Sequence, residues 1–247
     1  MHGRAVVSGF HLLHMLKQAN GPFRMSLDLG MTFSEVKKSD GHFIFPDNQI
    51  LSELKVQSAI KKHHPEDCFL VENGSLFYIY RFDGQNVYRL YEPRIDWPPT
   101  LWINGSMMHT VSISKPTDEA KEKVAQFGNL GNVLETCFGL GYVSIEMIRN
   151  GAYSVNSYEI SKDVLDIANV NPWSASALTD KRISVSNSDV KDSIANIGDN
   201  TYDSIMHDPP NVKLAGELYS LKFYSELFRV LKYGGTLYHF VGGGRIP

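Results

Sequence analysis

From Gly131 onward, strand-like and helix-like segments alternate, and this alternation constrains the fold more than any other feature of the chain. Short connections between alternating strands and helices are typical of a parallel sheet with helices on both faces. The sequence therefore predicts a doubly wound α/β sheet whose ligand crevice lies at the carboxyl ends of its strands. The predicted strands are residues 132–138, 154–160, 182–189, 202–209 and 236–244, and the predicted helices are residues 142–151, 161–171, 190–197 and 215–235.

The N-terminal region has a different texture, with short strand-like segments separated by turn signals. Asn73-Gly74 and Asp83-Gly84 favour hairpins because both residues of each pair tolerate positive φ. Helical spacing of apolar residues predicts two short helices in this region, at residues 10–19 and 49–62. A small β-rich domain with few helices is therefore expected.

A third helix is predicted to start at Pro116, which is followed by Thr, Asp and Glu, and to end near Gly128. In the last predicted helix an apolar stripe is expected to face the sheet. That stripe consists of Leu221, Tyr224, Leu227, Phe228 and Leu231. The predicted organisation is an N-terminal β-rich domain at residues 1–113, a connecting helix at 114–130 and a Rossmann-like domain at 131–247.

The composition is that of a globular protein, with 43% hydrophobic and 21% charged residues. A formal net charge of −3 argues against a tight, non-specific nucleic-acid binder. Cys68 and Cys137 match neither a zinc pattern nor a disulfide framework, so two reduced thiols are expected. No apolar run approaches the roughly 20 residues needed to cross a bilayer, and no signal-peptide pattern is present. We therefore expect a soluble cytoplasmic protein without a membrane partner.

The first predicted strand leads into a glycine turn, in which Gly139 and Gly141 follow Glu135. Two glycines one residue apart let the backbone turn sharply and approach a ligand at a helix N-terminus. Glu159 ends the second strand 18 residues after Gly141, close to the spacing of about 20 expected for an acid that binds ribose hydroxyls. The alternatives are a tight turn without a ligand and a solvent-facing glutamate.

The next two predicted strands also end in acids. Asp189 could accept a hydrogen bond from an adenine amine, cap the helix that follows, or do both. Asp208 precedes Pro209 and Pro210, which have no N–H to give a sheet and hold φ at about −65°. The prolines are expected to hold the backbone off the sheet, so that Asp208 faces the crevice and accepts hydrogen bonds or a proton from a substrate amine. A turn with an Asx cap is the alternative, and His207 is expected to point the opposite way and pack.

Four of the residues that follow Pro210 in the sequence are candidates to line an acceptor pocket. The alternative is that the glutamate is a surface acid and the two tyrosines only pack the helix. The candidates are Asn211, Glu217, Tyr219 and Tyr224.

Taken together, the strand-end residues resemble the ordered motifs of class I S-adenosylmethionine-dependent methyltransferases over residues 131–247. The matching positions are Glu135-x-x-x-Gly139-x-Gly141, Glu159, Asp189 and Asp208-Pro-Pro. Over a wider span, from "SLDLGMT" to "HDPPNVKLAGELYSLKFYSELFRVLK", the chain resembles predicted archaeal methyltransferases related to the spermidine synthases. The class normally continues with a helix and a β-hairpin after the fifth strand, so the sheet is expected either to lack its last strands or to close differently.

The resemblance implies S-adenosyl-L-methionine as the cofactor and assigns its binding residues. Glu135, Gly139 and Gly141 would hold the methionine end, with Glu159 on the ribose. Asp189 would lie at the adenine, and the residues that follow the two acids, Ile160 and Val190, would flank the ring. The catalytic set would be Asp208, Pro209 and Pro210, without a metal.

The leading hypothesis is methyl transfer to a nitrogen in RNA, protein or a small amine. Asn211 has no aromatic ring on which a flipped-out base could stack, and this argues against the amino group of an adenine base as the methyl acceptor. The first alternative is aminopropyl transfer from decarboxylated S-adenosylmethionine to a polyamine. Spermidine synthases have two catalytic acids near the fourth strand, whereas here Asp208 is followed by prolines.

The second alternative is a non-catalytic RNA- or protein-binding module with a vestigial cofactor site. Cations interleaved with aromatic residues can bind single-stranded nucleic acid, although an ordinary solvated face is the simpler interpretation. The residues concerned are Lys61, Lys62, His63, His64, Arg81, Arg89 and Arg94 with Tyr78, Tyr80, Tyr88 and Tyr91. A homodimer would also be compatible with such a β-rich region.

Overall fold

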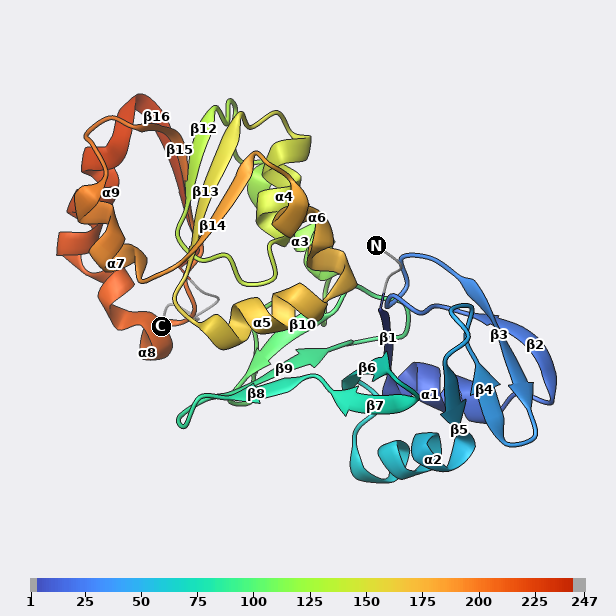
Figure 1. Ribbon diagram of the computed structural model, residues 1–247. Coiled ribbons are helices and arrows are strands. Elements are labelled where there is room, and N and C mark those ends of the chain that lie inside the picture. The colour runs from blue at the N-terminus through green and yellow to red at the C-terminus, as the bar shows by residue number, and fades with distance from the viewer. Residues whose placement is uncertain (1–3, 242–247) are drawn as a thin grey trace. The chain divides into compact units, whose positions relative to one another are not determined.

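The structure is a computed structural model, and it describes residues 4–241 (Figure 1). The chain divides into two compact units, which are described separately. The first unit is Met1–Pro116 with Asp166–Ala175, and the second is Thr117–Leu165 with Ser176–Pro247. Residues 166–175 join the first unit in part because the Trp173 indole N–H donates to the Leu29 carbonyl at 2.9 Å. The domain predicted from the sequence at residues 131–247 includes residues 166–175 without a break, and these domain limits stay a prediction.

Within the described residues, the first unit contains three antiparallel sheets and two complete helices. The sheet orders are β1-β6-β7, β2-β3-β4-β5 and β11-β10-β9-β8. The strands are β1 Ala5–Ser8, β2 Gly21–Met25, β3 Ser34–Ser39, β4 His42–Ile44, β5 Ile50–Ser52, β6 Cys68–Glu72, β7 Ser75–Tyr78, β8 Tyr80–Phe82, β9 Val87–Tyr91, β10 Thr100–Ile103 and β11 Ser106–Met107. The helices are α1 Gly9–Leu16 and α2 Glu53–Lys62, and the short 3₁₀ turn η1 is Pro172–Ser174.

Local sequence explains most of these elements. Asn73 and Gly74 both have positive φ, 51° and 65°, in the hairpin between β6 and β7, as the Asn-Gly signal predicts. The helix predicted at 49–62 begins instead at Glu53, so its first turn was wrong. Ile50–Ser52 pairs with β4, and the Ser52 hydroxyl then accepts the Lys55 N–H as an N-cap.

The second unit is built on a five-stranded sheet of order β14-β13-β12-β15-β16, and all of its pairings are parallel. The predicted doubly wound α/β sheet is therefore confirmed. Its strands are β12 Asn132–Glu135, β13 Ser154–Glu159, β14 Ile183–Asn187, β15 Tyr202–His207 and β16 Leu231–His239. Of the strand predicted at 236–244, residues 242–244 lie outside the described part of the chain.

Helices cover both faces of this sheet (Figure 1). They are α3 Pro116–Val124, α4 Tyr142–Arg149, α6 Ala175–Thr179, α7 Val190–Ser193, α8 Val212–Ala215 and α9 Leu221–Val230, with the 3₁₀ turns η2 Ile194–Asn196 and η3 Gly216–Tyr219. Helix α5, Lys162–Val170, begins in the second unit and ends in the first. One core packs α3 and α4 against β12 and β13, and a second packs α7 and α9 against β12 and β15.

The last predicted helix differs from the structure in both its extent and its buried face. Ser220 interrupts it, because its hydroxyl accepts the Phe223 N–H and starts α9 as a new helix. The buried residues of α9 are Phe223, Leu227 and Val230, whereas Leu221 and Phe228 are each 81% exposed. The predicted stripe was therefore wrong at Leu221 and Phe228. Tyr224 and Leu231 do pack against the core, although Leu231 is the first residue of β16.

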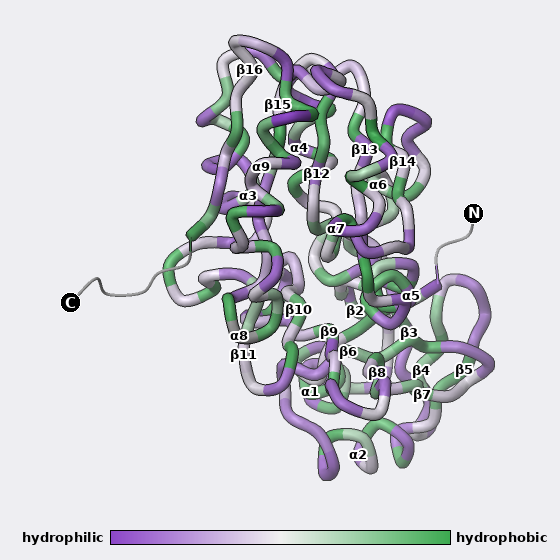
Figure 2. The backbone as a smooth tube through the Cα atoms, turned by 90° about the vertical axis from the view of Figure 1, so that its left-hand side faces the viewer, coloured by the Kyte–Doolittle hydropathy of each residue, from purple (hydrophilic) through white to green (hydrophobic). Residues whose placement is uncertain are grey.

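The trace coloured by hydropathy shows hydrophobic and hydrophilic stretches alternating through the chain (Figure 2). Within residues 4–241, no helix is long and apolar enough to cross a membrane.

The corrected face of α9 can be tested by a matched pair of substitutions. Leu227→Ala removes a fully buried side chain and is expected to lower the free energy of unfolding by about 2–5 kcal/mol. Phe228→Ala on the exposed face is expected to change it by no more than about 0.5 kcal/mol. Urea unfolding followed by circular dichroism measures both, and equal losses would contradict the assigned face.

Candidate functional site

The glycine turn after β12 contains two glycines, one with open space beside its Cα and one packed tightly against its neighbours. Gly139 has φ of 57°, and a Cβ built on it would meet no atom within 4 Å. Gly141 has φ of 73°, and a Cβ there would lie 2.6 Å from the Phe138 ring and 2.7 Å from Ala177. Gly141 is therefore needed for packing, while Gly139 leaves space beside a backbone that can approach a ligand.

Glu159 lies at the end of β13 and reaches back to this turn. Its carboxylate accepts the Gly139 N–H at 3.1 Å and the Ser161 N–H at 3.0 Å. Burial raises the pKa of Glu159 to about 7, and these backbone donors oppose the increase. The side chain is thus part of the turn, and the alternative of a solvent-facing glutamate does not describe it.

Glu135 ends β12 and is almost completely buried, with 1% exposure. It accepts a hydrogen bond from the Ser144 hydroxyl, which comes from the first turn of α4. Burial raises its pKa to about 7, and hydrogen bonds from Ser144 and Ser157 oppose the increase. Glu135 therefore braces the glycine turn from inside the domain.

Asp208 follows β15 and is bound by a lysine. The Lys123 ammonium lies 2.6 Å from Asp208 Oδ2 and 2.8 Å from Glu119 Oε1. Burial raises the pKa of Asp208, and the charge of Lys123 is the main opposing influence. Burial alone would lower the pKa of Lys123, but the two carboxylates outweigh it and the net direction is upward.

The three acids are electrostatically coupled at one edge of the sheet. Burial, and then the charges of Glu159, Asp208 and Glu135, raise the pKa of the Cys137 thiol well above its usual range. Asp208 and Glu159 in turn contribute to the raised pKa of Glu135. The carboxyl ends of β12, β13 and β15 therefore create one electronegative environment, which favours a cationic ligand.

The adenine-side residues are arranged less simply. Asp189 caps α7, because its carboxylate accepts the Lys191 N–H at 2.8 Å. Ile160 is 67% exposed, but Val190 is only 3% exposed and packs in the core. Of the two residues expected to flank an adenine, Ile160 thus has a side chain exposed on the surface. Val190 instead packs α7 against the core.

The residues after Asp208 are tied to one another. The Tyr219 hydroxyl donates to the Pro210 carbonyl at 2.9 Å, and the Tyr224 hydroxyl pairs with His239 Nε2 at 3.1 Å. Glu217 is exposed and forms an ion pair with Lys191, while Asn211 is exposed before α8. Tyr219 therefore supports the Pro-Pro segment, Tyr224 links α9 to β16, and the glutamate behaves as a surface acid.

His207 is fully buried and hydrogen-bonded on both ring nitrogens. Its Nε2 pairs with the Leu218 carbonyl at 3.0 Å and its Nδ1 with the Thr136 hydroxyl at 2.9 Å. The carbonyl must receive a proton, so Nε2 is the donor and Nδ1 the acceptor. Burial lowers the pKa of His207 to about 4, so it acts as a neutral packing group beside Asp208.

Lys123, Glu119 and His239 were not foreseen from the sequence. Lys123 does carry one signal, since it lies on the same face of α3 as Ala120 and Val124, which are both buried. A lysine within an apolar face requires a partner. That partner is 85 residues away in the chain, so the sequence does not indicate which residue it is.

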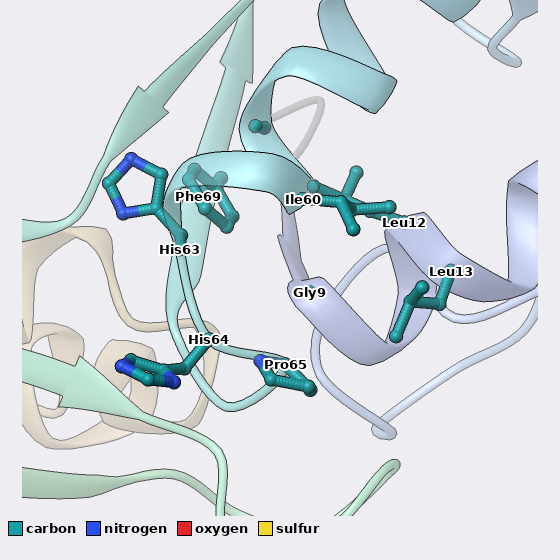
Figure 3. Close-up of a pocket in the computed structure, with 9 residues that line it drawn as sticks. Gly9, Leu12, Leu13, Ile60, His63, His64, Pro65 and Phe69 are labelled. Atoms are coloured by element: carbon teal, nitrogen blue, oxygen red, sulfur yellow. The ribbon is translucent and has the colours of Figure 1, made fainter.

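The first unit contains a small apolar pocket between α1 and α2 (Figure 3). Gly9, Leu12, Ile60 and Phe69 contribute to its wall, with His63 and His64 beside them. Its volume is about 50 Å³, less than the share of two water molecules in the liquid. The pocket therefore cannot hold a nucleoside.

Part of the proposed basic, aromatic surface is engaged in contacts within the first unit, whereas Lys61, Lys62, His64 and Arg94 are exposed. Arg89 stacks on the Trp102 ring at 3.5 Å and lies 3.6 Å from Asp67. The Tyr78 hydroxyl also donates to Asp67, and Tyr88 is buried.

Residues 4–241 contain no group of three or more His, Cys, Asp or Glu arranged to hold a metal ion.

Comparisons with known proteins complete this description. No protein-family model matches the chain. The uncharacterized protein MJ1233 of Methanocaldococcus jannaschii is 36% identical over 200 residues, which make up 80% of this chain and 66% of that protein.

Two solved structures share the fold. A spermidine synthase in complex with the transition-state analogue AdoDATO superposes with a TM-score of 0.54 at 16% identity, over 65% of this chain and 58% of the other. Spermidine synthase from Thermotoga maritima superposes with a TM-score of 0.51 at 15% identity, over 65% and 57%. This chain therefore spans less than two thirds of either synthase.

The second unit has a Rossmann-like parallel sheet, and the chain shares its fold with spermidine synthase. This recognition and the fold predicted from the sequence are confirmed. In particular, the chain is a relative of the archaeal protein MJ1233.

The buried acid of β12 predicts a pH dependence. The folded pKa of Glu135, about 7, exceeds its ordinary value of 4.5. The folded state therefore holds this proton more tightly, and the stability that it contributes is lost as the pH rises through 7. Relative to Glu135→Gln, the wild type should lose up to about 3 kcal/mol of unfolding free energy between pH 5 and pH 8.

Urea unfolding at several pH values measures this difference. Glu122→Gln on the exposed side of α3 is the matched control and should parallel the wild type. A constant offset between Glu135→Gln and the wild type across this range would contradict the account.

Proposed function

We propose that the chain binds S-adenosyl-L-methionine at the carboxyl edge of the second unit's sheet and transfers its methyl group to a nitrogen. The acceptor belongs to RNA, a protein or a small amine. The observation that supports the proposal is that Gly139, Glu159 and Asp208 follow the carboxyl ends of three neighbouring parallel strands, with the Gly139 N–H bonded to Glu159. A cytoplasmic location and a homodimer stay predictions.

The residues at this edge have the chemistry that such a cofactor requires. A Cβ at Gly139 would project into the open space where the ligand is proposed to lie, and the backbone conformation there favours glycine. The carboxylate of Glu159 can accept hydrogen bonds from two ribose hydroxyls. The coupled acids favour the positive charge of a sulfonium. Asp189 and Ile160 would then lie on the adenine side.

When bound, this cofactor would supply a sulfonium methyl group, whose carbon a nitrogen lone pair can attack in line as the C–S bond breaks and S-adenosylhomocysteine leaves. The chain's part is to orient the acceptor and exclude water, and such positioning alone can contribute about 7–11 kcal/mol. Asp208 would accept a hydrogen bond from the attacking N–H and take up the partial charge of its proton. Pro209 and Pro210 fix the backbone, and Tyr219 secures the Pro210 carbonyl.

Aminopropyl transfer remains the rival within the same fold. The likeness to spermidine synthase, at 15–16% identity, establishes only the fold. A non-catalytic module is the rival from another class. The three proposals differ in which adenosyl ligand stabilises the chain.

Thermal unfolding with S-adenosylmethionine, S-adenosylhomocysteine or decarboxylated S-adenosylmethionine distinguishes them. The first two ligands should raise the melting temperature, and saturation at 100 times Kd corresponds to about 2.7 kcal/mol. Gly139→Ala should abolish the increase, because the added methyl fills the ligand's space. The matched control is Gly151→Ala, which replaces another positive-φ glycine in an open position and should keep the increase.

Stabilisation by the decarboxylated ligand alone would favour aminopropyl transfer instead. Lack of stabilisation by any of the three ligands, together with salt-sensitive RNA binding, would favour the non-catalytic module.

A further inference from the structure

The proposed function does not explain a buried ionic cluster beside Asp208. The Lys123 cluster consists of Lys123 and Glu119 from α3, Asp208 after β15 and Phe240 after β16. The lysine ammonium contacts both carboxylates, at 2.6 and 2.8 Å, and lies 5.0 Å from the centre of the Phe240 ring. Three elements of the second unit thus surround one positive charge.

This cluster is not a solvated surface pair. The exposed fractions of the Lys123, Glu119 and Asp208 side chains are 8%, 13% and 20%. Removing charges from water is costly unless the geometry of the pair is good and additional contacts are made. Two short ionic contacts and a ring face meet that requirement. Displacing the lysine would leave two buried carboxylates without their cation, so we treat it as a permanent partner.

The pairing determines the state of Asp208. Burial raises the pKa of this carboxyl, and Glu119 raises it further, while Lys123 and His239 oppose the change. The charge of Asp208 also contributes to the raised pKa of Glu135 at the end of β12. It contributes in the same way to the raised pKa of Tyr219 in η3 and of Tyr238 in β16. Lys123 makes the closest of these contacts, so it is the group that most favours the carboxylate form.

The pairing also constrains what Asp208 can bind. Lys123 engages the Oδ2 atom, and the Oδ1 atom is not part of this ion pair. An ammonium held by two carboxylates is protonated and has no lone pair, so Lys123 is not itself the methyl acceptor. A polyamine would need carboxylates for several ammonium groups, but the charges of Asp208 and Glu119 are already shared with the lysine.

We propose that Lys123 is a positioning residue for the acceptor site. It holds Asp208 ionised and in one orientation, so that the site offers a fixed hydrogen-bond acceptor to an uncharged N–H nucleophile and not to a polyamine. This inference rests on the proposed function, since it names the acceptor class of the same site.

The first test follows Asp208 directly. Aspartate labelled with ¹³C at the side-chain carboxyl is titrated by NMR in the full chain, and Asp208→Asn identifies the signal. In Lys123→Met, the midpoint of this signal should rise by about 1–3 pH units, the usual influence of an adjacent opposite charge. Lys123→Arg retains the charge and should restore most of the wild-type value.

Two further variants make the result decisive. Lys121→Met removes an exposed lysine of the same helix and should leave the midpoint in place. If Lys123→Met does not fold, Glu119→Gln takes its place, and its midpoint should fall because an opposing negative charge is lost. An unchanged Asp208 midpoint in a folded Lys123 or Glu119 variant would overturn the positioning role.

The second test addresses the acceptor class. Thermal unfolding is measured with saturating S-adenosylhomocysteine, with and without spermidine or ethylammonium. The wild type should gain nothing from either amine, whereas Lys123→Ala should be stabilised by ethylammonium, which can occupy the vacated space between the carboxylates. Specific stabilisation of the wild type by spermidine would overturn the inference. Failure of S-adenosylhomocysteine to bind would instead refute the proposed function, so the two failures are distinguishable.

Discussion

Three carboxylates, those of Glu135, Glu159 and Asp208, are kept close together at the carboxyl edge of a parallel sheet. Mutual repulsion and burial both oppose this arrangement, and each acid has a specific compensation. Ser144 donates to Glu135, the backbone of the glycine turn donates to Glu159, and Lys123 pairs with Asp208. The turn, the start of α4 and the buried face of α3 are therefore all required to maintain the same negative environment.

The compensation differs in kind from one acid to the next. Within residues 4–241, the hydrogen-bond donors to Glu135 and Glu159 are neutral, and the pKa of each acid is raised to about 7, so their charge can respond to a cationic ligand. Asp208 instead has a full positive charge beside it. Under the proposed function, the first two acids would respond to a bound cofactor with a positive charge, and Asp208 would accept a hydrogen bond from the nucleophile.

The sequence predicts the sheet and the edge at which its acids meet, because parallel strands end on the same side. It could not predict which carboxyl would gain a partner. Lys123 and Asp208 are 85 residues apart and meet only through tertiary packing. The buried face of α9 was misjudged because Leu221 and Phe228 also have helical spacing, and only the cap at Ser220 shows where the helix begins. Val190 follows a strand-end acid as expected, but its side chain is needed in the core.

The central claim is that Gly139, Glu159 and Asp208 border one adenosyl site. A crystal structure of the chain with S-adenosylhomocysteine tests it most directly. We expect the ribose hydroxyls to donate hydrogen bonds to the Glu159 carboxylate. The amino-acid part of the ligand should lie beside Gly139, and its sulfur should face Asp208. A nucleoside bound elsewhere on the chain, with Glu159 still closed onto the Gly139 N–H, would contradict it.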